Sequence, residues 1–267
     1  MIDKITKLLA NTFKLATSDL ANQYAVPVKS MTGLFVSNYG ATKSKHLNKL
    51  VVQSMRLKPD DFIFELGFGR GDALEMCFNH IRNGKGMVFG VERSGYMNER
   101  ALKRFALEIV ESGKIRIDSA IDPRNLPYPT DLFDHVFHVD LFYFLQQEAL
   151  LAVNQELLRV LKPGGVLTCG MQLNRLKNLT NHRLLDETQW DPMRYMCSLE
   201  AAKFSDVQIN YHTDPQMGEY QIISAQKATH PLVHQNPEEL FEELAKDMKK
   251  ERLAIAMMKA PRDSRDN

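Results

Sequence analysis

Phe62-Ile-Phe-Glu-Leu-Gly-Phe-Gly-Arg-Gly71 decides the fold, because a buried-strand pattern runs through the acidic Glu65 into a glycine-rich turn. Glycine stands at alternate positions of this turn, at Gly67, Gly69 and Gly71. Glycine adopts backbone angles closed to other residues and has no Cβ, so a ligand can press against the main chain. A negative charge at Glu65 would repel the pyrophosphate of a dinucleotide and attract an ammonium group. The segment therefore predicts a nucleotide-like ligand that carries a positive charge.

The glycine spacing separates two kinds of cofactor. NAD-binding turns have the pattern G-x-G-x-x-G, whereas this chain has G-x-G-x-G. Together with Glu65, the segment resembles motif I of the class I S-adenosylmethionine-dependent methyltransferases. The resemblance implies a methyltransferase enzyme that binds S-adenosylmethionine through Glu65, Gly67, Gly69 and Gly71. The alternative is a turn that needs its glycines for loop geometry only.

A second acidic residue follows at the end of the next strand. After a predicted helix from Asp72 to about Ile81, the buried strand Met87 to Val91 ends in Glu92. An acid at the tip of the strand after a glycine loop is placed to accept hydrogen bonds from the ribose hydroxyls. The resemblance gives this role to Glu92 and places Arg93 in the same cofactor site. The alternative is a surface ion pair between Glu92 and Arg93.

The loop after a third predicted strand, at 115–117, resembles the adenine-contacting loop of the family. The resemblance implies that Asp122 holds the adenine amino group. Pro123 departs from the usual pattern, because proline has no N–H to donate to the adenine ring. Ile121 or a neighbouring residue could supply the apolar wall or the missing donor.

The remaining strands are predicted in the order of the methyltransferase fold. A fourth strand is expected at 133–140, and Lys162-Pro-Gly-Gly165 is expected to end a helix before the fifth strand. Strands at 207–211 and 220–225 are joined by a link too short for a helical crossover, so they should pair antiparallel. We expect an α/β fold, a Rossmann-like seven-stranded methyltransferase sheet with helices on both faces and a C-terminal antiparallel hairpin.

Length and composition predict one catalytic domain with extensions. The chain has 267 residues and a hydrophobic content of 44%, enough for one sizeable core. We place an N-terminal helical or lid extension at 1–49, the S-adenosylmethionine-binding domain at 50–227, and a C-terminal helix with a disordered tail at 228–267. Phe35 and Tyr39 are lid candidates, with packing on the first helix as the alternative.

Charge and cysteine content argue against several other functions. A net charge of +1 without a basic stripe gives no reason to expect nucleic acid as a partner. The three cysteines are widely spaced and form neither a zinc pattern nor a disulfide framework, so we expect no metal and a reducing compartment. No apolar run approaches the length of a membrane span. We expect a cytoplasmic protein, with a mitochondrial presequence in the amphipathic segment 1–15 as the alternative.

Segments outside the predicted sheet should hold the methyl acceptor. A helix is expected from about Thr42 to Met55, after an apolar, glycine-punctuated segment. The insertion after the fifth strand contains Arg175, Arg183 and Arg194, which could bind an acidic substrate or stay solvated at the surface. An apolar stripe in a predicted helix at 237–258 could dock on the domain or on a second subunit, so a homodimer through the terminal helices is one expectation.

The chemistry of the predicted cofactor sets what the protein must supply. Methyl transfer from a sulfonium is an in-line displacement, so the enzyme mainly aligns the reactants and excludes water. A base is optional, and His138, Asp140 and Tyr143 lie at or beyond the end of the fourth strand, where a base would be useful. Each has an alternative role. His138 could be a strand-end residue with its hydrogen bonds made inside the protein, Asp140 could cap a helix or bind the amino group of the cofactor, and Tyr143 could belong to the core.

We therefore expect methyl transfer from S-adenosylmethionine to a small-molecule acceptor with an oxygen, nitrogen or carbon nucleophile. The resemblance is to the broad group that includes quinone, sterol and small-acid enzymes. A methyltransferase-like binding or interaction protein without catalysis is the alternative. The glycine spacing and Glu65 disfavour a nicotinamide-dependent dehydrogenase.

Overall fold

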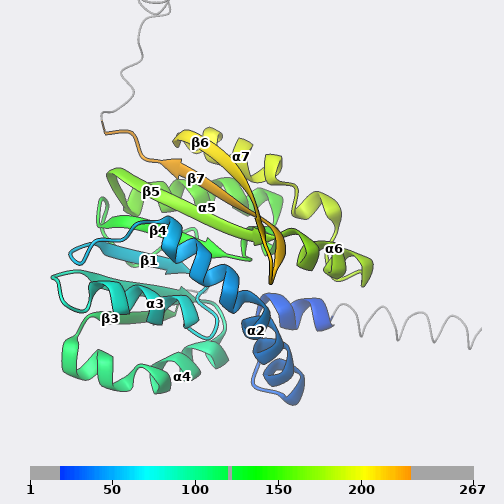
Figure 1. Cartoon of the computed structure of the whole chain (residues 1–267), viewed down its shortest axis with the longest axis horizontal. Coiled ribbons are helices and arrows are strands. Elements are labelled where there is room, and N and C mark those ends of the chain that lie inside the picture. Colours follow the sequence, from blue (N-terminus) through cyan, green and yellow to red (C-terminus); the bar gives the residue numbers. More distant parts are fainter. Residues whose placement is uncertain (1–18, 120–121, 230–267) are drawn as a thin grey trace, which may run out of the picture. The chain divides into compact units, whose positions relative to one another are not determined.

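One seven-stranded sheet organises the part of the chain that the structure describes, residues 19–119 and 122–229 (Figure 1). The strands of this computed structural model are β1 (Phe62–Leu66), β2 (Met87–Glu92), β3 (Ile115–Ser119), β4 (Phe133–Val139), β5 (Leu161–Gln172), β6 (Ser205–Asp214) and β7 (Gly218–Gln226). They lie in the order β3-β2-β1-β4-β5-β7-β6. The predictions about Ile121, the segment 1–15 and the helix at 237–258 fall outside the described residues.

The directions of the strands match the predicted fold. β1 pairs in parallel with β2 and β4, and these two pair in parallel with β3 and β5. β7 runs antiparallel to both β5 and β6. The prediction of a Rossmann-like seven-stranded sheet with a C-terminal antiparallel hairpin is confirmed. The parallel strands bring the carboxyl ends of β1, β2 and β4 to one edge, where ligands bind in open α/β sheets.

Helices cover both faces of the sheet (Figure 1). They are α2 (Met31–Ser54), α3 (Asp72–Ile81), α4 (Gly95–Arg104), α5 (Gln147–Val160), α6 (Leu173–Asn181) and α7 (Pro192–Ala201). The buried residues of α2, α3 and α4 join one hydrophobic cluster, and those of α5, α6 and α7 join another. Among the described residues, no helix is both long and apolar enough to cross a membrane.

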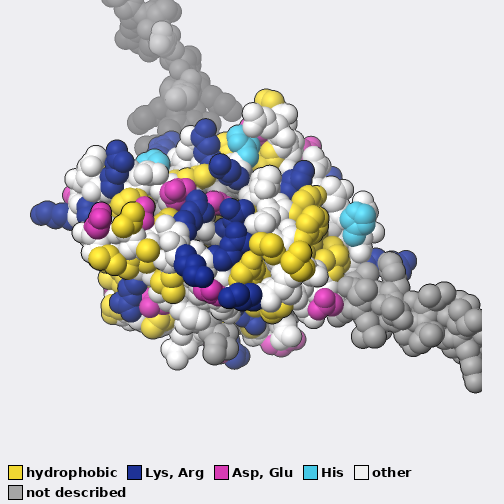
Figure 2. All heavy atoms as spheres, turned by 90° about the horizontal axis from the view of Figure 1, so that it is seen from below, with side chains coloured by type: hydrophobic (Ala, Val, Ile, Leu, Met, Phe, Trp, Pro, Cys, Tyr) yellow, Lys and Arg dark blue, Asp and Glu magenta, His cyan; other side chains and the backbone are white. Residues whose placement is uncertain are grey.

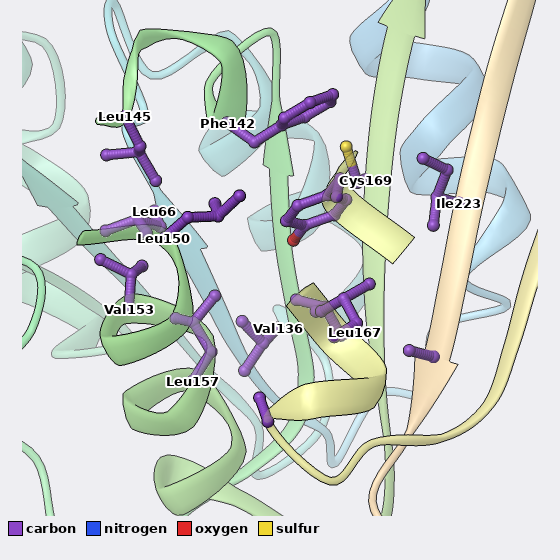
Figure 3. Packing of buried hydrophobic residues seen from close by; sticks show 14 of the residues in the cluster. Leu66, Val136, Phe142, Leu145, Leu150, Val153, Leu157, Leu167, Cys169 and Ile223 are labelled. Carbon is purple, nitrogen blue, oxygen red and sulfur yellow. The ribbon is translucent and has the colours of Figure 1, made fainter. Parts of the chain in front are cut away.

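The side chains of β1 divide between the two hydrophobic clusters. Ile63 packs with α2 and α3, whereas Phe64 packs in the cluster of α5, because successive side chains of a strand point to opposite faces. Figure 3 shows Leu150 and Leu157 of α5 on the side of the helix that faces Val136 of β4. Burial of such a side chain contributes about 1.5–3 kcal/mol, so this packing holds β1 and β4 firmly beneath the ligand edge.

Helix α2 begins earlier than the sequence pattern predicts. We expected a helix from about Thr42, but the structure shows one continuous helix from Met31. Ser30 caps it, since its hydroxyl accepts a hydrogen bond from the N–H of Gly33 at 2.9 Å. Glycine is required at Gly33, because a Cβ there would lie 2.0 Å from the carbonyl oxygen of Val28. The apolar segment before Thr42 is therefore part of a helix and not a loop.

The Lys-Pro-Gly-Gly segment lies directly after the end of helix α5, where we expected it, and it also forms a bulge in β5. The helix stops at Val160, and sheet pairing starts at once between Leu161 and Phe133. The next β4 residue with a recorded partner, His135, pairs with Val166, so the segment between Leu161 and Val166 bulges out of the ladder. Pro163 thus lies where it prevents the helix from continuing, and the segment also shifts the register of β5.

Candidate functional site

A cavity opens at the carboxyl ends of β1, β2 and β4. The glycine turn and the end of β2 line it, together with residues from α2, α6 and the loop after β4. Its volume is about 1190 Å³ including the open mouth. It lies at the edge of the sheet where ligands bind in open α/β folds.

The glycine turn after β1 exposes its main chain to this cavity. Gly67, Gly69 and Gly71 have φ angles of 76°, 55° and 79°, in the left-handed region that glycine adopts without strain. A Cβ at Gly71 would lie 2.5 Å from the ring of Phe105, whereas a Cβ at Gly69 would meet nothing within 4 Å. Gly71 is therefore required for packing, while Gly69 leaves space on the cavity side for a ligand.

Glu65 is the buried acid of the site. Only 3% of the residue is exposed, and it lines the cavity from the end of β1. Its Oε2 atom has no hydrogen-bond partner among the described residues. Burial raises the pKa of Glu65 well above its usual value, and the charges of Asp72 and Glu92 raise it further. A ligand ammonium group would both satisfy this oxygen and stabilise the ionised carboxylate.

Glu92 lies across the turn from Glu65 and fixes the backbone around the cavity. Its carboxylate accepts hydrogen bonds from the N–H of Gly69 at 3.0 Å and from the N–H of Ser94 at 2.9 Å. Burial raises the pKa of Glu92, and these backbone N–H groups oppose the shift. Arg93 also lines the cavity, and it makes no ion pair with Glu92 within the described part of the chain. Each oxygen of Glu92 keeps a lone pair for a hydroxyl of the ligand.

The predicted adenine loop is only partly placed at the cavity. Pro123 lines it, whereas Asp122 is absent from the described residues that do so. The carboxylate of Asp122 accepts hydrogen bonds from the guanidinium of Arg124, as close as 2.7 Å, and this pairing lowers the pKa of Asp122 to about 2. An adenine amino group would have to share Asp122 with Arg124.

Asp140 faces the cavity from the position just after β4. Its φ angle is 55°, a left-handed conformation that Asp tolerates better than most residues. The hydroxyl of Tyr143 donates to its Oδ1 at 2.6 Å, and the hydroxyl of Ser44 donates to its Oδ2 at 2.9 Å. The guanidinium of Arg175 also donates to Oδ2 and to the Ser44 oxygen. Asp140 thus has three donors on its two oxygens.

His138 and Tyr143, the other two base candidates, lie in the core. His138 is 2% exposed, its Nε2 lies 2.6 Å from the hydroxyl of Tyr195, and burial lowers its pKa to about 3. Burial also raises the pKa of Tyr143. Neither residue is among the described residues that line the cavity. The structure brings only Asp140 of the three to the ligand edge.

Several residues of the cavity were missed by sequence reasoning. They share a position on α2 or on the helical segment before it, and they include Tyr24, Ser44 and Asn48. No local motif marks them, because they reach the site through the packing of α2 against the sheet. Their only signal in the sequence is the pair of small residues at Gly40 and Ser44, which lie on one helix face.

Of the three predicted substrate arginines, one reaches the cavity. Arg175 at the start of α6 lines it, with 16% of its side chain exposed. Arg194 instead donates to the backbone carbonyls of Gln189 and Leu145, each at 2.9 Å. Arg183 is exposed just after α6, within the same insertion. The insertion therefore contributes a single cation to the site.

Residues 63–165 match the methyltransferase domain family. This segment is a methyltransferase domain of the class I S-adenosylmethionine-dependent type. The predictions of this family, of a methyltransferase enzyme and of S-adenosylmethionine as its cofactor are confirmed. The family segment includes β1 with Glu65, the glycine turn and β2 with Glu92.

Solved structures show the same methyltransferase fold at low sequence identity. A Haloferax volcanii methyltransferase, in complex with the Trm112 methyltransferase activator, is 19% identical with a TM-score of 0.61, over 73% of this chain and 94% of that one. Geranyl diphosphate C-methyltransferase from Streptomyces coelicolor is 14% identical with a TM-score of 0.55, over 69% and 81%. The cyclase SpnF is 17% identical with a TM-score of 0.55, over 70% and 82%. No curated protein matches the sequence significantly.

The surface around this methyltransferase site is mixed in character. Figure 2 views the molecule from the side on which α4 and the first turns of α2 lie in Figure 1, and Lys and Arg side chains gather there beside a hydrophobic area. In the first turns of α2, Met31 is 83% exposed, Phe35 70% and Tyr39 47%, and the rings of Phe35 and Tyr39 stack. The lid candidates thus lie at the surface on a helix that lines the cavity with its other side.

Proposed function

We propose that this methyltransferase transfers the methyl group of S-adenosylmethionine to a small-molecule acceptor bound in the cavity between the glycine turn and α2. The observation that carries the proposal is the buried Oε2 of Glu65, which has no hydrogen-bond partner among the described residues. In the same turn, Gly69 has no side chain and leaves open space. A buried polar atom without a partner is costly, so a ligand that supplies a donor there is stabilised.

The residues at the carboxyl ends of β1 and β2 fit the parts of the cofactor. Glu65 has the charge and the free oxygen to hold an ammonium group. Glu92 keeps acceptor capacity for ribose hydroxyls while its backbone bonds fix its position. Pro123 and Arg93 border the same space and could contact the adenine, with Asp122 and Ile121 as the further candidates from the family resemblance. When bound, S-adenosylmethionine supplies the electrophilic methyl group.

The chain's own contribution to the reaction is alignment and exclusion of water. Asp140 accepts three hydrogen bonds, and His138 and Tyr143 are buried in contacts of their own. None of the three is a ready general base in this arrangement. The site therefore suits an acceptor whose oxygen, nitrogen or carbon nucleophile needs little help with deprotonation, held in line by the walls of the cavity.

Isothermal titration calorimetry with S-adenosylmethionine, S-adenosylhomocysteine and NAD is the first test. We expect micromolar binding of the two sulfur ligands and no binding of NAD. The matched control is Glu65→Gln, which keeps the shape of the side chain and removes the charge. Binding of NAD alone would overturn the proposal, and wild-type affinity in Glu65→Gln would remove Glu65 from the cofactor site.

A turnover assay must follow, because the shared fold does not by itself fix the reaction. The cyclase SpnF has this fold, and the Haloferax volcanii methyltransferase was solved with an activator protein. Release of S-adenosylhomocysteine with pools of small molecules is expected if the acceptor is small. Cofactor binding without turnover in any pool, alone or with cell extract, would favour a non-catalytic binding or interaction protein. A cytoplasmic location and a homodimer through the terminal helices remain further proposals.

A further inference from the structure

The acceptor side of the cavity contains the guanidinium of Arg175, which is held in place by hydrogen bonds from only one of its nitrogens. Arg175 donates through one nitrogen, Nη1, to Asp140 and Ser44. Ser44 and Tyr143 in turn donate to Asp140, so the carboxylate is fixed from three sides. These contacts join α2, α6 and the loop after β4, and they set the plane of the guanidinium before any ligand arrives.

The second edge of the Arg175 guanidinium, formed by Nε and Nη2, is not used by these contacts, and Arg175 lines the cavity. Nε and Nη2 make no hydrogen bond with another described residue, although Arg carries five donors. Gly40 of α2 lies against this edge, because a Cβ built there would be 3.6 Å from Nη2. Nε and Nη2 form the parallel pair of N–H groups that matches the two oxygens of a carboxylate. The structure thus leaves the bidentate edge of a buried arginine available to a ligand.

The other arginines of the same insertion differ from Arg175 in this respect. The guanidinium of Arg194 donates hydrogen bonds to two backbone carbonyls and to the side chain of Gln147. Arg183 is exposed just after α6 and does not line the cavity. Only Arg175 combines burial, a fixed orientation and an open edge on the cavity.

The remainder of the acceptor wall is largely apolar. It includes Leu141, Phe144 and Leu145 beyond β4, together with Val36 and Ala41 on α2. An acceptor that fills this space would bury an apolar body and present one polar group to Arg175. Because Asp140 already carries a negative charge beside Arg175, a singly charged group is repelled less than a phosphate with nearly two charges.

We propose that Arg175 binds a carboxylate on the methyl acceptor, so that the substrate is an apolar molecule that carries one acidic group. This proposal rests on the proposed methyl transfer and names the class of substrate for the same cavity. Arg175 contacts the substrate and determines specificity, whereas Asp140 and Ser44 are positioning residues that act through it. The carboxylate then anchors one end of the acceptor, and the apolar walls direct the rest toward the cofactor.

Titration of the full-length protein, monitored by NMR at the Nε–H signal of Arg175, tests the proposal with defined probes. Benzoate carries a carboxylate on an apolar ring, benzamide is its neutral counterpart, and phenyl phosphate carries a dianion. We expect a saturable shift of the Arg175 signal with benzoate, and binding about 10- to 100-fold tighter than that of benzamide, as for a charge-assisted bidentate pair. The Arg183→Lys variant should keep this preference, because Arg183 lies outside the cavity.

The variants are chosen so that folding does not obscure the result. Arg175→Lys keeps the charge but loses the bidentate edge, and it should lose most of the preference for benzoate. Arg175→Gln combined with Asp140→Asn removes both charges together and should abolish the preference in a protein that still unfolds cooperatively. A preference that survives in both variants would overturn the role of Arg175.

The outcomes separate this proposal from the one on which it rests. The protein could bind S-adenosylhomocysteine and yet bind benzoate and benzamide with equal affinity. This result would overturn the carboxylate site and leave the proposed methyl transfer intact. Tighter binding of phenyl phosphate than of benzoate would also overturn it, in favour of a phosphate acceptor. The protein could instead bind benzoate tightly at Arg175 without binding S-adenosylhomocysteine. This result would overturn the proposed function, and the carboxylate ligand would then not be a methyl acceptor.

Discussion

The two walls of the cavity are built in different ways. The cofactor wall is local in sequence: Glu92 accepts from the N–H of Gly69, only 23 positions away, within one β-α-β unit. The acceptor wall is assembled from distant segments, since Ser44 lies 96 positions from Asp140 and 131 positions from Arg175. The cofactor wall relies on backbone N–H groups and glycines, whereas the acceptor wall relies on side chains that hold one another.

The two walls therefore differ in whether their residues contribute to ligand affinity or to the free energy of unfolding. Glu65 is buried with an unpartnered oxygen and a raised pKa, so it lowers the free energy of unfolding of the ligand-free protein. A bound ligand that donates to this oxygen would gain affinity from it. Asp140 and Arg175 satisfy each other in the free protein, so they help to hold α2, α6 and the β4 loop together. Changes in the cofactor wall should affect affinity, and changes in the acceptor wall should affect folding as well.

The largest effect is expected from Arg175→Met. The substitution leaves the carboxylate of Asp140 buried without its cation, which typically costs about 3–5 kcal/mol of the free energy of unfolding. Ser44 and Tyr143 still donate to Asp140, so we expect a loss near the lower end of that range. Urea unfolding measures it, and adding Asp140→Asn should restore most of the lost stability. If Arg175→Met unfolds at the wild-type urea concentration, the acceptor wall is not held together by this ion pair.

Glu65→Gln should give the opposite pattern. Loss of the charge should weaken binding of S-adenosylhomocysteine by about 1.5–3 kcal/mol, the usual contribution of a hydrogen bond to a charged group. The unfolding free energy should stay the same or rise, because a buried carboxyl with a raised pKa is replaced by a neutral amide. Calorimetry and urea unfolding of the same preparation check both parts. A destabilised Glu65→Gln with unchanged affinity would remove the contrast between the walls.

The contrast also explains what the sequence could and could not predict. Glu65, the three glycines and Glu92 lie within one short unit, where spacing translates directly into geometry, and the sheet order follows from the sequence of elements. Ser44 and Asn48 could not be predicted, because no local pattern indicates that α2 packs across the sheet toward α6. Arg175 could be named as one of three candidate arginines, but only its packing distinguishes it from Arg183 and Arg194.

A pH titration sharpens the comparison further. In the free protein the pKa of Glu65 is raised, and a cationic group of the ligand would lower it, so binding should release up to one proton. Affinity for S-adenosylhomocysteine should therefore increase with pH, by at most about tenfold per pH unit, through the range in which Glu65 ionises in the free protein. Arg175 stays charged throughout, so binding of benzoate should not follow this trend. Calorimetry in buffers of different ionisation enthalpy counts the protons, and Glu65→Gln should release none.

The smallest effect is expected from Gly40→Ala, with Gly33→Ala as its matched control in the same helix. Ala in place of Gly inside a helix is favourable by about 1 kcal/mol, and the new methyl at position 40 meets only Nη2 of Arg175, at 3.6 Å. Gly40→Ala should thus unfold at a slightly higher urea concentration. Gly33→Ala should be destabilised, because its Cβ would lie 2.0 Å from the backbone oxygen of Val28.

The same methyl group tests the acceptor wall directly. At Gly40 it occupies space in front of the open edge of Arg175, so Gly40→Ala should bind benzoate more weakly although it is the more stable protein. Binding of S-adenosylhomocysteine should be unchanged, since a methyl group at Gly40 would meet only Arg175 and neither Glu65 nor Glu92 within 4 Å. A gain in stability with full benzoate affinity would mean that ligands reach Arg175 from another side. A parallel loss of cofactor affinity would mean that the two walls are coupled, and that the division between a local cofactor wall and an assembled acceptor wall does not describe how the site works.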